Sequence, residues 1–211
     1  GMDCKLNMFG GRIYGGRATQ DAALVWVLNT STFNMYGGEL YDGIADGNGG
    51  AINVGGSATA NLYGGEIYDC ESEAYGGGVY AVLGSPNLYL GKNLTIHNNT
   101  AIKGGNVYYN GNKELLIEGS VITGGSAENY GGGVYCAQGT VTLKGDTVIR
   151  DNAQGNLYIP AQIPLDATAL TQDAEVYLYN MSAMTLSASK YLKLERSGYK
   201  VATIGGQTVG I

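Results

Sequence analysis

Asp42 and Asp69 are the residues whose type and spacing most directly suggest chemistry. Each follows a tyrosine, and the separation between them matches the spacing of other similar segments in the chain. If each segment forms one layer of a stacked structure, the two carboxylates lie about 5 Å apart on neighbouring layers. With Asp46 nearby, such a pair can bind Ca²⁺ or act as acid and nucleophile in glycoside hydrolysis. The alternative is that aspartate at the end of a strand makes local hydrogen bonds to turn backbone.

An aromatic column is the second candidate site. Its members recur once per segment, directly after an apolar residue, and we expect them to point outward as a stack. Flat rings one layer apart can pack on sugar rings or contact a protein partner. The alternative is that the rings only shield and stabilise the stacked strands. The column consists of Trp26, Tyr80, Tyr108, Tyr135 and Tyr158, with Asn53 between the first two.

Other charged residues give weaker signals. Glu39 and Glu66 have the same separation as Asp42 and Asp69, and Arg12 precedes them in the same column, so we expect a solvated ladder in which Arg12 offsets Glu39. His97 is the single histidine and adjoins an Asn-rich turn, which favours a solvated turn residue over a catalytic one. A catalytic or lyase-type site would need Arg or His on the face of Asp42 and Asp69, and the sequence places none there.

A sequence repeat must position these side chains. NMFGGRIYGG begins at Asn7, NMYGGELYDG at Asn34 and NLYGGEIYDC at Asn61, which are equal steps, and the pattern then loosens. A second motif runs in parallel as GGAINV, GGGVYAV, GGNVYYN, GGGVYCA and QGNLYIP. Each unit holds three short runs that alternate apolar and polar residues, bounded by Gly, Asn or Asp, which is typical of short strands. Such strands bury an apolar face only when unit stacks on unit.

The repeat therefore predicts an all-β fold, a single-stranded right-handed parallel β-helix of about six coils. Three inward columns are expected. The first is Val25, Ile52, Val79, Val107, Val134 and Leu157; the second is Met8, Met35, Leu62, Leu88, Leu115 and Val141; the third begins with Ile13, Leu40, Ile67 and Leu94. Phe9, Tyr36, Tyr63 and Tyr89 are expected to form an outward stack.

The glycine distribution predicts two parts: a β-helix region over residues 1–159 and a small β-rich C-terminal cap over residues 160–211. Pro160 and Pro164 interrupt the repeat, and few glycines follow. Within the cap we expect strands over 175–179, 200–204 and 208–211, and a turn or short helix over 187–195. At the other end the chain enters its first coil by Leu6. We expect that coil to be uncapped and covered by an upstream domain, by a missing segment or by a partner, including a second copy in an end-to-end homodimer.

Composition and charge exclude several classes of protein. The chain has 36 Gly and 3 Pro in 211 residues, without the three-residue period of collagen. Its net charge is −6 and it has no clusters of basic residues, which argues against nucleic acid and anionic membrane surfaces as partners. No apolar run is long enough to span a membrane, and the N-terminus has no signal-peptide core. Cys4, Cys70 and Cys136 are too far apart for a zinc motif.

The glycine-rich units resemble a known class of repeats. Gly49-Gly50-Ala51-Ile52, GGGVYAV and GGGVYCA are similar to the GGAI-type repeats of polymorphic outer-membrane proteins and related adhesin-like autotransporter passengers, over residues 7–159. The Asn that usually follows a Phe in those repeats is not clearly present, and no membrane barrel follows. The resemblance implies an extracellular or cell-surface β-helix used in adhesion or as a spacer, with a glycan or a host or cell-surface protein as partner.

Two functions remain open from the sequence. The first is a non-enzymatic, surface-associated β-helix, adhesin-like or a structural spacer, that needs no cofactor. The alternative is a Ca²⁺-dependent polysaccharide lyase or glycoside hydrolase of the β-helix type, which shares the pectate-lyase-like fold and would use Asp42, Asp46 and Asp69. The near-equal length of the units favours the first, because no long loop builds the walls of a cleft.

Overall fold

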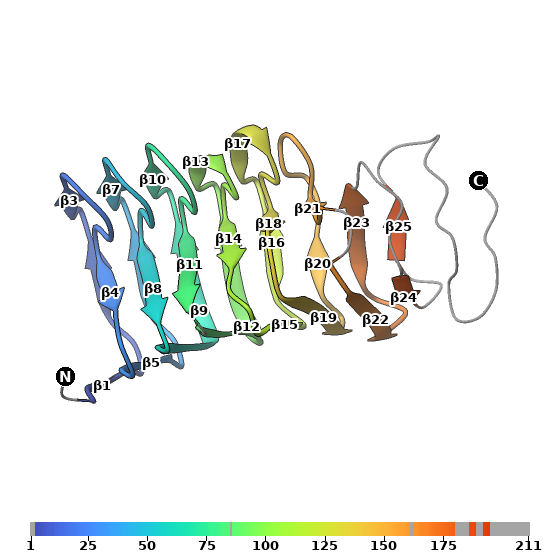
Figure 1. Cartoon of the computed structure of the whole chain (residues 1–211), viewed down its shortest axis with the longest axis horizontal. Helices are drawn as coiled ribbons and strands as arrows, with labels where there is room; N and C mark the ends of the chain where they lie inside the picture. The colour runs from blue at the N-terminus through green and yellow to red at the C-terminus, as the bar shows by residue number, and fades with distance from the viewer. Residues whose placement is uncertain (1–2, 85, 161–162, 180–185, 189–191, 195–211) are drawn as a thin grey trace.

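The computed structural model is a parallel β-solenoid of about six turns, in which the strands stack along one axis (Figure 1). It describes residues 3–84, 86–160, 163–179, 186–188 and 192–194. Each of the first six coils contributes one strand to each of three faces, and the first five add a short fourth strand. The predicted fold class is confirmed. Short strands of this kind can bury one side each only by stacking coil on coil.

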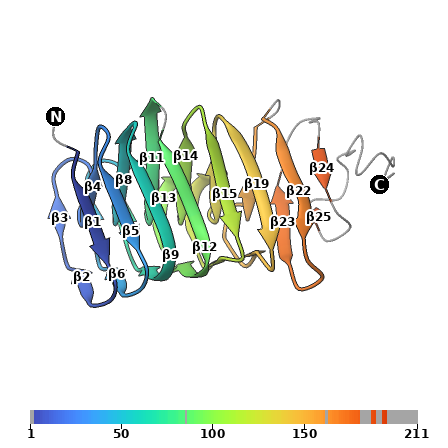
Figure 2. The same ribbon diagram turned by 90° about the horizontal axis from the view of Figure 1, so that it is seen from below.

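The strands of the three faces alternate along the chain, and Figure 2 shows face 1. Face 1 contains β1 (Lys5–Met8), β5 (Thr32–Met35), the first half of β9 (Thr59–Tyr68), the first half of β12 (Asn87–His97), β15 (Glu114–Glu118), β19 (Thr140–Gly145), β22 (Leu165–Leu170) and β24 (Leu186–Ala188). Face 2 contains β2 (Arg12–Tyr14), β6 (Glu39–Tyr41), the second halves of β9 and β12, β16 (Val121–Thr123), β20 (Val148–Ile149), β23 (Glu175–Tyr179) and β25 (Leu192–Leu194). Face 3 contains β4 (Val25–Val27), β8 (Ile52–Gly56), β11 (Val79–Gly84), β14 (Val107–Asn110), β18 (Val134–Cys136) and β21 (Leu157–Tyr158).

A fourth, five-stranded sheet lies along one edge of the solenoid (Figure 1). It forms between faces 2 and 3 and contains β3 (Arg17–Ala18), β7 (Ile44–Ala45), β10 (Glu71–Ser72), β13 (Thr100–Lys103) and β17 (Ser126–Tyr130). After β17 the chain no longer forms a fourth-sheet strand between faces 2 and 3, and the coil is shorter as a result. The step from Val141 to its partner Leu165 is three positions shorter than the step from Thr32 to its partner Thr59.

The first inward column is the one that the sequence predicted. Val25, Ile52, Val79, Val107, Val134 and Leu157 pair in unbroken register. All six are buried. Burying one such side chain contributes about 1.5–3 kcal/mol relative to leaving it exposed, so the column is a main source of stability.

The other two predicted columns shift by two residues at the fourth coil. The pairing of β12 with β9 places Leu90 opposite Leu62 and, after a bulge between Leu90 and Asn93, Ile96 opposite Ile67, where the sequence predicted Leu88 and Leu94. The Met8 column therefore continues through Leu90, Ile117 and Leu143, and the Ile13 column through Ile96, Ile122 and Ile149. Leu88, Leu115 and Val141 form a neighbouring inward column with Phe33 and Ala60. Inward alternation survives because a two-residue shift keeps each side chain on its face.

Glycine occupies the corner between faces 1 and 2 because the backbone there leaves no room for a side chain. Gly38 has φ of 102°, and a Cβ atom on it would lie 2.7 Å from the carbonyl oxygen of Gly11 in the preceding coil. Both the positive φ and the close approach exclude other residues. The pairs Gly10-Gly11, Gly37-Gly38 and Gly64-Gly65 therefore mark this corner.

A buried asparagine network holds the junction between face 2 and the fourth sheet in the later coils. The Asn106 amide donates to Asn152 Oδ1 over 3.0 Å, and Asn152 also accepts from the backbone N–H of Gly125 over 2.8 Å. The Asn152 amide in turn donates to the carbonyl oxygen of Ile122. A Cβ on Gly125 would lie 2.5 Å from the Asn106 amide nitrogen, so glycine in one coil makes space for asparagine in its neighbours.

Strands continue past the predicted cap boundary at residue 160. The predicted strand over 175–179 is confirmed as β23, which pairs in parallel with both β20 and β21. The turn or short helix predicted over 187–195 is wrong where the structure describes it, because β24 and β25 continue the stacking on faces 1 and 2. The short spacing of these last coils hides the repeat from a search at the period of the early coils. The strands predicted over 200–204 and 208–211 lie outside the described residues.

Candidate binding surface

Three outward columns cross the first coils of face 2 and its corner with face 1. Phe9, Tyr36 and Tyr63 come directly after the inward residues Met8, Met35 and Leu62 and stand at the corner. Two glycines follow, and then the first residue of each face 2 strand forms a charged column. The second residue points inward, so the third forms another aromatic column outside. The charged column is Arg12, Glu39 and Glu66; the outer aromatic column is Tyr14, Tyr41 and Tyr68.

The corner column, which we call ladder 1, is a regular ring stack. The ring centroids of Phe9 and Tyr36 lie 5.0 Å apart, as do those of Tyr36 and Tyr63, with interplanar angles of 6° and 9°. All three rings are exposed, Phe9 to 76%. Tyr89 contacts Tyr63 but is tilted by 58°, because its backbone pairs with Asn61 and not with Tyr63. The predicted outward stack is thus confirmed for three members, with Tyr89 displaced by the shifted register of β12 on β9.

The outer aromatic column, ladder 2, was not recognised in the sequence. Tyr14, Tyr41 and Tyr68 stack at 4.9 and 5.0 Å, and His97 continues the stack 5.1 Å from Tyr68. His97 is therefore the last residue of a strand within a ring stack and not a turn residue. The recurrence of tyrosine at the end of NMFGGRIY, NMYGGELY and NLYGGEIY was the signal that could have found it.

The charged column between the ladders is held by an internal ion pair and by a hydrogen bond from ladder 2. Arg12 Nε lies 3.2 Å from the Glu39 carboxylate, as the sequence predicted, and this contact raises the pKa of Arg12. The Tyr68 hydroxyl donates to Glu39 over 3.0 Å. Loss of hydration raises the pKa of Tyr68 to about 12, and the neighbouring Glu39 carboxylate adds to the shift. Glu66, exposed and one coil further, has no ion-pair partner among the described residues.

The aromatic column that the sequence proposed as a binding surface is stacked but partly covered. Tyr80, Tyr108, Tyr135 and Tyr158 follow one another with ring centroids 4.9–5.4 Å apart. Tyr80 and Tyr108 are nevertheless only 9% and 8% exposed, so the expectation of an open surface is wrong for these two. Burial raises the pKa of each to about 12.

Side chains from the fourth sheet, together with Tyr75 from the segment after β10, cover this column. Tyr75 stacks on Tyr108 at 4.9 Å, Tyr130 stacks on Tyr158 at 4.8 Å, and the Lys103 ammonium lies 5.4 Å from the ring centroid of Tyr135. These three covering residues directly precede the Gly-Gly motif in successive coils, a pattern visible in the sequence as AYGGG, IKGGN and NYGGG. The rings of this column thus serve mainly to pack face 3 against the fourth sheet.

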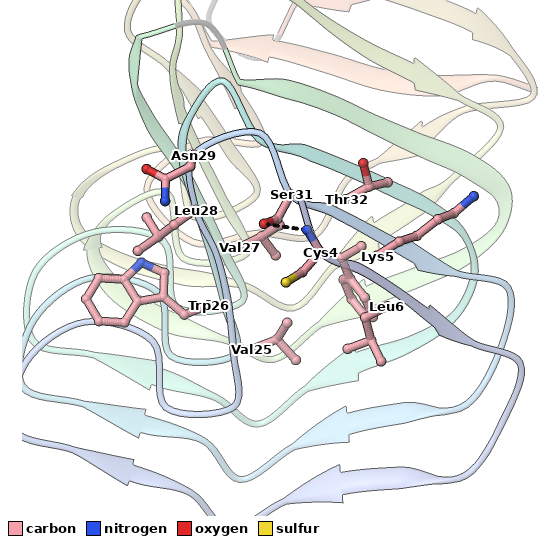
Figure 3. Close-up of a pocket in the computed structure, with 11 residues that line it drawn as sticks. Cys4, Lys5, Leu6, Val25, Trp26, Val27, Leu28, Asn29, Ser31 and Thr32 are labelled. Carbon is pink, nitrogen blue, oxygen red and sulfur yellow. Dashed lines mark hydrogen bonds between the residues drawn. The ribbon is translucent and has the colours of Figure 1, made fainter. Parts of the chain in front are cut away.

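Trp26 begins the same column but lies apart from it. It pairs in register with Asn53, is 52% exposed, and has no ring contact among the described residues. Its side chain lines a groove of about 320 Å³ at the first coil, together with inward residues such as Leu6, Val25 and Val27 (Figure 3). In this coil the ends of faces 1 and 3 leave the apolar interior open.

The aspartates proposed as a cation or catalytic site follow the last residue of a face 2 rung. Asp42 and Asp69 both have left-handed backbone conformations, with φ of 54° and 51°. The first six coils all adopt this conformation at the same position, whatever residue stands there. The full column is Gly15, Asp42, Asp69, Asn98, Gly124 and Asp151, with φ between 51° and 70°. Gly, Asn and Asp are the residues that tolerate this conformation, so backbone geometry accounts for the two aspartates.

The third proposed ligand, Asp46, lies on the fourth sheet, directly after β7, where its backbone N–H bonds to the carbonyl oxygen of Ala18. All three aspartates are exposed. Within the described residues, no group of three or more His, Cys, Asp or Glu side chains is arranged to hold a metal ion. A cation site at Asp42, Asp46 and Asp69 therefore stays a prediction.

Comparison with known proteins adds no relative. The chain matches no family model, no curated protein and no solved structure. Its likeness to adhesin-type repeats therefore rests on the sequence motifs, and the fold is what the structure adds to them. In the part of the chain that the structure describes, no helix is long and apolar enough to cross a membrane.

Proposed function

We propose that this protein is a non-enzymatic, surface-displayed β-helix of the adhesin type that binds an extended glycan along face 2. The observation that carries the proposal is the arrangement of ladders 1 and 2, which run parallel to the solenoid axis on either side of the charged column of Arg12, Glu39 and Glu66. Aromatic side chains combine apolar surface with a polar tip, and carboxylates accept hydrogen bonds from hydroxyl groups. An extended chain of sugars offers both kinds of contact at every residue.

The stacking restricts how such a ligand is held. A ring covered on both sides by the rings of neighbouring coils has no face left for a sugar. Among the described residues, Phe9, Tyr14 and His97 stand at ends of the two ladders and have one ring neighbour each. Along the rest of the ladders the ring edges, the phenol hydroxyls and the Glu66 carboxylate make the contacts. We therefore propose binding by a row of hydrogen bonds along the coils, without stacking of a sugar on a ring face.

The enzymatic alternative has less support. A glycosidase or a Ca²⁺-dependent lyase needs carboxylates at its catalytic or Ca²⁺-binding positions. Asp42 and Asp69 instead belong to a column in which other coils have glycine or asparagine. The proposed location at the cell surface follows from the same adhesin-like motifs and is part of the proposal.

A glycan array probed with the purified chain tests the binding function. We expect binding to one class of extended glycan, weakened about tenfold by Glu66→Gln, the effect of losing one hydrogen bond to a charged group. Glu128→Gln, at an exposed position on the fourth sheet, is the matched control and should bind like the wild type. No binding to any glycan, or equal loss in both variants, would contradict the proposal.

An activity assay separates binding from catalysis. The chain is incubated with pectin-type and other acidic polysaccharides, with and without Ca²⁺, and the products are measured. We expect no turnover. Turnover that Asp69→Asn abolishes would establish the enzymatic alternative, because asparagine preserves the left-handed corner while removing the carboxylate.

A further inference from the structure

The first coil exposes groups that the later coils bury wherever the structure describes their side chains. Each of its strands is paired along one edge within the described residues: β1 with β5, β2 with β6, β3 with β7 and β4 with β8. Leu6 occupies the same inward column as Phe33, yet it is 50% exposed whereas Phe33 is 1% exposed. Unpaired strand edges beside an open apolar interior form a template for further strands.

We propose that this coil is a self-complementary interface through which two copies of the chain join head to head. Rotation by a twofold axis perpendicular to the solenoid reverses the direction in which the chain circulates. Strands that meet across the contact are therefore antiparallel. The open strand edges of the first coil lie on three faces and on the fourth sheet. A second copy has strand edges around the same cross-section, so one partner can pair with all of them.

The residue pattern of β1 is compatible with this pairing. Cys4, Leu6 and Met8 alternate with Lys5 and Asn7, and Figure 3 shows the side chains of Cys4 and Lys5 extending in opposite directions at the groove. Antiparallel pairing centred on Leu6 places Leu6 opposite its own symmetry mate, Cys4 opposite Met8 and Lys5 opposite Asn7. Inward residues then meet inward residues, which is the condition for a stable register.

The other faces also match. A twofold axis through β1 brings β2 of one copy against β4 of the other. A register that sets Ile13 against Val27 continues the apolar interior, and it sets Tyr14 against Trp26. These two outward rings are 61% and 52% exposed in the single chain. An aromatic pair across antiparallel strands is a favourable contact, and it would cover both rings.

Charge is compatible with self-association at this coil. It carries Lys5, Arg12 and Arg17 together with Asp3 and Asp21, so each copy offers both signs to the other. Between Arg17 and Lys92 the chain has no Lys or Arg and eight Asp or Glu if Asp21 is included. Of the first three coils, only the first thus has the mixed charge that a symmetric contact needs.

Cysteine substitution tests the register. In a Cys4→Ser background, Leu6→Cys places two thiols opposite each other, at the Cα separation of about 4.5–5.5 Å that a disulfide accepts. Lys5→Cys is the matched control, because residue 5 meets residue 7 and its own mate is a diagonal neighbour about 7–8 Å away. Both variants are treated with diamide, and linked dimers are measured on a non-reducing denaturing gel. We expect linkage at residue 6 at least tenfold faster than at residue 5.

Light scattering during gel filtration tests the association itself. We expect twice the mass of one chain for the wild type and the mass of one chain for Leu6→Asp, with the β-type circular dichroism unchanged. Leu116→Asp, at an outward position in a middle coil, should remain a dimer. A wild type that stays monomeric at every concentration would overturn the proposal and leave the coil to a different partner. Equal linkage at residues 5 and 6, or faster linkage at residue 5, would also overturn it.

Discussion

At the scale of single residues, backbone conformation explains why aspartates that suggest a cation or catalytic site stand where they do. The corner after each face 2 strand is left-handed in six successive coils, and the residues there are three aspartates, one asparagine and two glycines. A left-handed conformation costs most residues about 1–2 kcal/mol. Asp and Asn tolerate it because their short side chains bond locally. A carboxylate column with a period of one coil therefore arises without a ligand or a substrate.

Substitution at Asp69 distinguishes the conformational role from a chemical one. We expect Asp69→Asn to leave the free energy of unfolding unchanged, and Asp69→Ala to lower it by about 1 kcal/mol because alanine disfavours positive φ. Urea unfolding followed by circular dichroism measures both. Asp46→Ala, in which the exposed aspartate follows a strand without positive φ, is the control and should be neutral. If Asn and Ala cost the same, the carboxylate itself contributes to stability.

Buried thiols and phenols predict sensitivity to alkaline pH. Burial raises the pKa of Cys70, Cys136 and Tyr109 to about 12, from ordinary values of 9.0 and 10.0. These groups lose their protons at lower pH in the unfolded chain than in the folded one. Their contribution to stability is complete below about pH 9 and is lost as the pH rises towards 12.

We therefore expect the urea midpoint to fall steadily between pH 9 and 12 and tyrosinate absorbance to appear with unfolding. Near neutral pH, Ellman's reagent should label Cys4, which is exposed, and leave Cys70 and Cys136 unmodified until urea is added. Rapid labelling of all three cysteines in the native chain would contradict this burial.

At the scale of elements, the junction between face 2 and the fourth sheet depends on Asn152. Its side chain accepts from Gly125 N–H and from the Asn106 amide, and donates to the carbonyl oxygens of Ile122 and Arg150. Asn152→Ala removes all four of these hydrogen bonds, and a buried group left without a partner, such as the Gly125 N–H, costs about 1–3 kcal/mol. We expect a loss of at least about 2 kcal/mol in unfolding free energy by the same principle, measured in urea. Asn129→Ala, on the exposed side of β17, should have almost no effect.

The elements also show what could be predicted from the sequence. Strict recurrence of similar units predicted the solenoid, the Val25 column and the Arg12–Glu39 contact, because each depends only on which residues lie one coil apart. The register shift of two residues in β12 was not predictable, since inward alternation reads the same after it. The cover over Tyr80 and Tyr108 was missed because it depends on how the fourth sheet folds against face 3. The segment between faces 2 and 3 brings Tyr75 onto the ring of Tyr108, which stands in the following coil.

At the scale of the whole molecule, the chain behaves as a one-dimensional stack. Each coil contacts the coils before and after it, and the three inward columns, the ring ladders and the strand pairing all repeat along the same axis. Stability in such a protein is close to a sum of coil terms and nearest-neighbour terms. The number of residues in a coil varies along the chain. Once the fourth sheet has ended, fewer residues separate Leu165 from its partner Leu186 than separate any earlier pair of partners on face 1. The constraint that persists is that each face 1 strand lies over the previous face 1 strand.

Removal of one whole coil tests this view of the molecule. Deleting residues 37–63 joins Tyr36 to Gly64, so that Gly64-Gly65 replaces the Gly37-Gly38 corner and Val79 comes to lie over Val25. Every inward column then keeps its sequence of apolar residues. We expect a folded chain with cooperative unfolding, and a urea m-value lower by about an eighth, in proportion to the residues removed. The control deletes residues 50–63, which removes the face 3 strand β8 and the face 1 part of β9 but keeps β6 and β7. The columns of the second and third coils no longer coincide in that variant, and we expect it to lose cooperative unfolding. Equal behaviour of the two deletions would show that contacts beyond neighbouring coils hold the molecule together.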